Sequence, residues 1–134
     1  MEKKKILLTH SKISDILDVV IKKCSVPIIG STNFYEVLAI ARAKEIEKLG
    51  IIYDTKGINP LEIIKRIRMA DPTVQILAWD CHTYFEDLAD YPELLAEDIF
   101  FLDSHKFKSD CFFEIVNDFF TGKLTPFTVN ELTT

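Results

Sequence analysis

Side chains that can ligate a metal, accept a phosphoryl group or exchange protons lie at the ends of several short apolar runs. His10, Asp54, Asp80 and His105 each end or follow such a run. Imidazoles and carboxylates of this kind support metal binding, acid–base catalysis or phosphoryl transfer. The chain contains no H-E-x-x-H motif, C-x-x-C pair or glycine-rich phosphate loop. None of these chemistries therefore has a dedicated sequence motif.

The three histidines are His10, His82 and His105. They leave open, as a less favoured alternative, a metal-binding or enzymatic site at the edge that holds His10, Asp54, Asp80 and His82. Neighbouring strands lie about 4.8 Å apart, so His10 can approach Asp54, whereas His10 and His105 would be roughly 14 Å apart. That separation is too large for one ion. Cys81 follows Asp80, whose charge opposes formation of a reactive thiolate. We therefore expect no enzyme, no catalytic residue and no metal ion or other cofactor.

Apolar periodicity predicts alternating strands and helices that would bring these polar residues together. The predicted strands are Ile6–Leu8, Val26–Ile29, Ile51–Tyr53, Val74–Trp79 and Ile99–Leu102. The predicted helices begin after Ser11, Asn33, Asn59 and Thr83, and a last one spans Ser109–Thr121. The helix after Asn33 is expected to reach Leu49, with Gly50 at its left-handed C′ position.

The predicted strands are nearly continuous apolar runs, which is typical of a parallel sheet covered on both faces. Right-handed crossovers then leave few topologies. We predict an α/β fold in three α/β/α layers: a doubly wound five-stranded parallel sheet, flavodoxin-like, of order 2-1-3-4-5. In such folds, ligands bind at the carboxyl ends of the strands.

The length and composition favour one folded domain without a membrane or nucleic-acid partner. The chain has 134 residues and a net charge of −5, with no basic stripe of the kind that nucleic acids need. No apolar run is long enough to span a membrane. Three widely spaced cysteines favour a reduced, cytoplasmic setting. We place the domain at residues 1–122 and a polar tail or linker at 123–134.

The middle of the chain resembles the receiver domains of two-component response regulators. The resemblance rests on Ile51-Ile-Tyr-Asp54, the helix Leu61–Arg68, the pair Asp71-Pro72 and the strand Val74–Ala78. It implies that Asp54 occupies the phospho-acceptor position at the end of the third strand. It also implies a bacterial-type signalling function.

The remaining receiver positions depart from the family pattern. Thr9 and His10 stand where receivers carry the two acids that hold Mg²⁺, and they are poor ligands for that ion. Asp80 replaces the hydroxyl residue that binds the phosphoryl group, and its charge would repel that group. Leu102 aligns with the family's lysine, unless a loop insertion brings His105 there. The resemblance thus implies a pseudo-receiver in which Mg²⁺ binding and phosphorylation of Asp54 are disfavoured. A phospho-accepting regulator with an altered site is the main alternative.

Aromatic residues are concentrated near the end of the predicted domain. Seven of the ten phenylalanines lie between residues 100 and 120: Phe100, Phe101, Phe107, Phe112, Phe113, Phe119 and Phe120. Adjacent residues on a helix point about 100° apart, so we expect some of these rings to be exposed. The resemblance implies docking through the fourth helix, fifth strand and fifth helix. We therefore expect a protein partner, or self-association, to contact Phe100, Phe101, Phe107, Phe112 and Phe119. A wide helix stripe that buries all the rings is the alternative.

Overall fold

The computed structural model of the chain describes residues 2–9, 15–52, 60–79, 99–102 and 111–124. Its strands are β1 (Lys4–Thr9), β2 (Ile29–Ser31), β3 (Ile46–Ile52), β4 (Gln75–Trp79) and β5 (Ile99–Leu102). Its helices are α1 (Asp15–Lys23), α2 (Phe34–Arg42), α3 (Pro60–Ala70) and α4 (Cys111–Thr121). The predicted helix after Thr83 lies outside the described residues.

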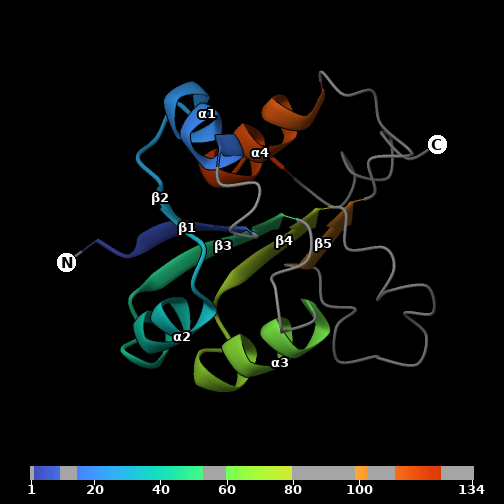
Figure 1. The fold of residues 1–134 in the computed structure, drawn as a ribbon. Helices are drawn as coiled ribbons and strands as arrows, with labels where there is room; N and C mark the ends of the chain where they lie inside the picture. The colour runs from blue at the N-terminus through green and yellow to red at the C-terminus, as the bar shows by residue number, and fades with distance from the viewer. Residues whose placement is uncertain (1, 10–14, 53–59, 80–98, 103–110, 125–134) are drawn as a thin grey trace.

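The strands form a parallel sheet with β1, β3 and β4 in its interior (Figure 1). β1 pairs with β2 on one side and with β3 on the other, and β4 pairs with the far side of β3. β5 in turn runs parallel to β4 and pairs with it. The predicted α/β class and the parallel strand order 2-1-3-4 are confirmed.

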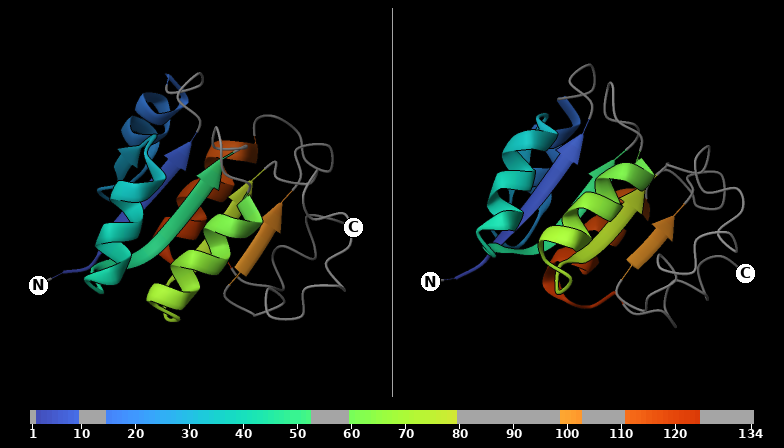
Figure 2. Two further views of the ribbon diagram at one scale, coloured as in Figure 1. Left: turned by 60° about the horizontal axis from the view of Figure 1, so that its bottom comes forward. Right: turned by 90° about the horizontal axis from the view of Figure 1, so that it is seen from below.

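Helices cover both faces of the sheet. α1 and α4 lie on one face, and α2 and α3 lie side by side on the other (Figures 1 and 2). Alternate residues of the strands supply the two cores, because successive side chains of a strand point to opposite faces. Leu49 and Ile51 pack with the α2–α3 layer, whereas Leu7, Ile52 and Leu77 pack with the α1–α4 layer.

The largest error of the sequence-based prediction concerns the end of α2 and the start of β3. The helix was expected to reach Leu49 with Gly50 at its C′ position. Instead α2 ends at Arg42, and β3 runs from Ile46 to Ile52 with Gly50 inside it. The residue in the left-handed region is Lys44, at φ 61°.

Backbone hydrogen bonds explain why the helix can end at a lysine. The Lys44 N–H donates to the carbonyl of Ala41 at 2.9 Å, and the Glu45 N–H donates to that of Ile40 at 3.2 Å. These two bonds form a Schellman motif, which satisfies carbonyls at the end of a helix. The Lys44 ammonium also contacts the carbonyl of Ala70 at the end of α3. The motif therefore forms without glycine, the residue that usually identifies it in a sequence.

Gly50 has a different structural role, which is close packing between β3 and the α1–α4 layer. A Cβ atom at this position would lie 2.8 Å from Leu7 Cδ1 and 3.3 Å from Phe120 Cζ. Both neighbours are fully buried. A side chain at position 50 would therefore displace the core on this face.

Several other element boundaries were predicted closely. The Asn33 side chain caps α2 and accepts from the Tyr35 N–H at 3.0 Å. α3 begins at Pro60, as its fixed φ favours. Gly122 has φ 82° and follows the end of α4, as expected. The prediction of β2 is less accurate: the strand is Ile29–Ser31 rather than Val26–Ile29, so it starts three residues and ends two residues later than predicted.

The aromatic end of the domain is more buried than the sequence predicted. Phe119 and Phe120 are each only 1% exposed, although they are adjacent on α4. Both fit because α4 packs against the sheet and also against α1 beside it, which gives it a wide buried stripe. Phe119 is therefore a core residue, and the expectation that it contacts a partner is wrong. Leu124 is also buried in this core, so packing extends two residues beyond the predicted boundary at 122.

The left-handed conformation of Lys44 predicts a stabilising substitution. A non-glycine residue in this conformation costs roughly 1–2 kcal/mol, which glycine avoids. We expect Lys44→Gly to unfold at higher urea concentration than Lys44→Ala, by about 1 kcal/mol in free energy of unfolding. Alanine is the matched control because both variants lose the contact with Ala70. Equal stabilities would show that position 44 is not left-handed.

Candidate functional site

The candidate site lies at the carboxyl edge of the sheet, where four strands end in one row. Thr9 pairs with Ile52, Ile52 with Trp79, and Trp79 with Leu102. These residues are the last of β1, β3, β4 and β5. With strands about 4.8 Å apart, the row extends roughly 14 Å from Thr9 to Leu102.

Thr9 is the one residue of the predicted pocket whose side chain is described. It is completely buried, and its hydroxyl donates to the carbonyl of Ile52 at 3.2 Å. The hydroxyl thus joins the ends of β1 and β3 instead of facing the edge. Position 9 therefore has a structural role and offers no free ligand atom to a cation.

The other predicted site residues come after the strand ends in the sequence, except Leu102, which is itself the last residue of β5. His10, Asp54 and Asp80 lie outside the described residues, as do His82 and His105. Leu102 is described only as the last residue of β5. The structure therefore brings the strand ends together and leaves the predicted roles of these side chains untested.

Sequence reasoning missed a buried lysine on the α1–α4 side of the sheet. Lys48 is 7% exposed, and its ammonium donates to the carbonyl of Phe119 at 2.6 Å. The ammonium also lies 5.4 Å from the centre of the Phe119 ring. It therefore stabilises the carboxyl end of α4, where the helix dipole is negative. The prediction missed it because it placed residue 48 in a helix, although a lysine within the apolar run Ile46–Ile52 was a visible signal.

Burial is the main influence on the charge of Lys48. It lowers the pKa of the ammonium below the ordinary value, because the charged form loses hydration. The carboxylate of Glu47 opposes this effect, and the charge of Lys5 adds to it. Glu47 is itself paired with Lys5, with 3.0 Å between Oε2 and Nζ. The negative charge of Glu47 thus compensates the buried positive charge of Lys48 only in part.

A second buried charge, Asp71, lies in the turn between α3 and β4, at the amino edge of the sheet. Asp71 is 3% exposed and accepts from the hydroxyl and the N–H of Thr73, at 2.6 and 3.0 Å. The Thr73 hydroxyl is the main cause that lowers the pKa of Asp71, with burial opposing it and Lys3 and Lys44 assisting. This pattern is a turn motif that connects α3 to β4. It has no feature specific to catalysis.

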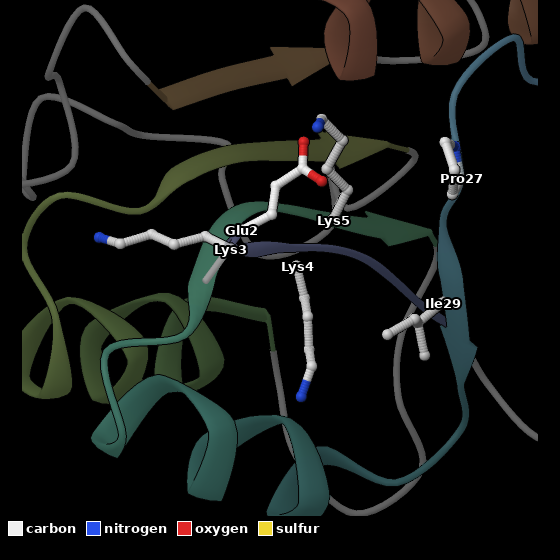
Figure 3. Close-up of a pocket in the computed structure, with 6 residues that line it drawn as sticks. All are labelled: Glu2, Lys3, Lys4, Lys5, Pro27 and Ile29. Atoms are coloured by element: carbon white, nitrogen blue, oxygen red, sulfur yellow. The ribbon is translucent and has the colours of Figure 1, made fainter.

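A pocket of about 220 Å³ also lies near this amino edge (Figure 3). Three consecutive lysines line it, together with Glu2, Pro27 and Ile29. Lys4 and Lys5 point to opposite sides of β1 in Figure 3, and each is paired with a glutamate of the chain. Because the ammonium groups of Lys4 and Lys5 point apart and each already pairs with a glutamate, the pocket is a poor site for an anion.

Within the described ranges, no group of three or more His, Cys, Asp or Glu residues could hold a metal ion. The helices of the same ranges include none that is long and apolar enough to cross a membrane. Comparison with models of protein families and with curated proteins gives no match to this chain.

The buried hydroxyl of Thr9 predicts a measurable structural role. We expect Thr9→Val to lower the free energy of unfolding by about 1 kcal/mol, because the carbonyl of Ile52 loses a partner in a buried place. Thr9→Ser keeps the hydroxyl and serves as the control. Urea denaturation measures both. If valine were as stable as threonine, the hydrogen bond would not contribute.

The lowered pKa of Lys48 predicts a dependence of stability on pH. Between the folded-state pKa and the ordinary value of 10.5, the unfolded chain binds more protons at this site than the folded chain does. Wild-type stability relative to Lys48→Met should therefore rise as the pH increases through this alkaline range. Chemical denaturation of both proteins at a series of pH values measures the difference. A difference that falls with pH would contradict the burial of the charge.

Proposed function

We propose that the chain is a receiver-like signalling domain that acts by protein–protein interaction and not by phosphorylation of Asp54. Its fold would be the doubly wound, five-stranded flavodoxin-like form. The parallel order 2-1-3-4, the β4–β5 pairing and the helices on both faces support that fold. The row of strand ends supports a position for Asp54 at the carboxyl edge, two residues after Ile52.

The observation that carries this proposal is the inward orientation of Thr9. A receiver needs acids at the end of its first strand to hold Mg²⁺, since phosphoryl transfer depends on charge neutralisation and positioning. Here the corresponding side chain is uncharged, buried and bonded to the carbonyl of Ile52. The absence of an acid at position 9 supports a domain in which Asp54 is not a phosphoryl acceptor.

We propose that the interaction surface is formed by the edge strand β5 together with the helix α4. Phe119 is excluded from it because it is a core residue. Phe113 is half-buried, and the Lys23 ammonium lies 4.4 Å from its ring centre. The candidate contact residues are Phe100, Phe101, Phe107 and Phe112. Their number in a short segment supports a surface for a protein partner. The three widely spaced cysteines support a reduced, cytoplasmic setting.

Treatment with a small acyl phosphate and Mg²⁺, followed by intact-mass measurement, tests the proposal. We expect no gain of a phosphoryl group, because the chain lacks the metal-binding acids of a receiver. A receiver with a complete acidic pair, treated in parallel, shows that the reagent is active. The variant Asp54→Asn shows whether any labelling is specific to the acceptor position.

A phosphoryl group on wild type that is absent from Asp54→Asn would overturn the proposal. It would favour the alternative of a phospho-accepting regulator with an altered site. Labelling of both proteins would indicate modification elsewhere and would leave Asp54 without an acceptor role.

A further inference from the structure

The α2–α3 layer forms an outer surface that the proposed function does not use. Both helices connect parallel strands, so they run in the same direction, opposite to the strands. They lie side by side on one face of the sheet (Figure 2). Their inner residues are in the core, and their outer residues face away from it.

This surface is concave and partly apolar. A groove of about 410 Å³ lies between the helices, lined by Leu38, Arg42, Glu62, Arg66, Met69 and Ala70. Met69 is 86% exposed and Tyr35 on α2 is 63% exposed. They are the two most exposed large apolar side chains of the described residues. Burying the side chains of Tyr35 and Met69 against a partner of matching shape would therefore be favourable.

The charges of this surface follow the direction of the helices: on α2 they lie at opposite ends, and on α3 the acidic residue again precedes the basic one, by one turn. Glu36 and Glu62 lie in the first turns of α2 and α3, whereas Arg42 lies in the last turn of α2 and Arg66 in the second half of α3. Glu36 and Arg42 are exposed, and no ion pair among the described residues includes either of them. Arg66 pairs with Glu62 at 3.0 Å, but both side chains are about half exposed. Such a pair contributes little and can exchange its partner.

We propose that this α2–α3 surface is a dimer interface between two copies of the chain, with the helices of one copy antiparallel to those of the other. A two-fold axis across the helices places the acidic end of each copy opposite the basic end of its partner. It also places each Tyr35 end opposite a Met69 end. A uniformly acidic or basic partner would be repelled at one end, so a second copy is the best match in charge.

Charge variants of the two ends test this dimer. Glu36→Lys with Glu62→Lys makes the surface basic throughout, and Arg42→Glu with Arg66→Glu makes it acidic throughout. We expect wild type to sediment as a dimer at high micromolar concentration and each variant to sediment as a monomer. An equimolar mixture of the two variants should restore a dimer that contains one copy of each.

The mixture makes the test specific, because only an antiparallel pairing of these two ends predicts recovery. Native mass spectrometry identifies the mixed dimer, and circular dichroism verifies that both variants are folded. Glu2→Lys with Asp18→Lys makes the same charge change as the basic variant at exposed positions off α2 and α3, and should leave the dimer intact. Added salt should weaken wild-type association, since exposed charges are screened beyond about 8 Å at physiological ionic strength.

Three results would overturn the interface: a monomeric wild type at every concentration, a dimer that persists in both charge variants, or a mixture that stays monomeric. None of the four substituted residues lies on β5 or α4. The outcome is therefore independent of the proposed signalling surface and of phosphorylation.

Discussion

The burial of β3 on both faces is the constraint on which the rest of the structure depends. From Lys48 to Ile52 its residues are buried and alternate between the two helical layers, so each of these side chains must fit a core that is already filled. Gly50 fits because Leu7 and Phe120 leave no space for a Cβ atom. Lys48 is tolerated because its ammonium reaches the carbonyl of Phe119 at the end of α4. The same strand supplies the Ile52 carbonyl that holds Thr9.

The two edges of the sheet satisfy their polar groups in different ways. At the amino edge, charged side chains pair locally: Lys4 with Glu45, Lys5 with Glu47, and Asp71 with Thr73. At the carboxyl edge, the described polar contact is uncharged and lies within the sheet. Thr9 and Ile52 thus hold the ends of β1 and β3 together without an ion pair.

The sequence predicted the parallel order of the first four strands because their apolar runs are nearly continuous and are separated by helical periodicity. It did not predict the end of α2, because Lys44 takes a conformation that glycine usually adopts, and Gly50 provided a misleading stop signal. It also missed the double burial of Phe119 and Phe120, which depends on α1 packing against α4. For the site, it identified position 9 but not that its hydroxyl points inward. Such details depend on tertiary contacts rather than on local pattern.

The end of α4 fixes the position of the two described residues that follow Gly122. Gly122 reverses the chain, and the N–H groups of Lys123 and Leu124 both donate to the carbonyl of Asp118. Leu124 then enters the core beside α1. Lys123 and Leu124 are thus held to the end of α4 by hydrogen bonds and by packing, so a displacement of this helix would move both residues with it.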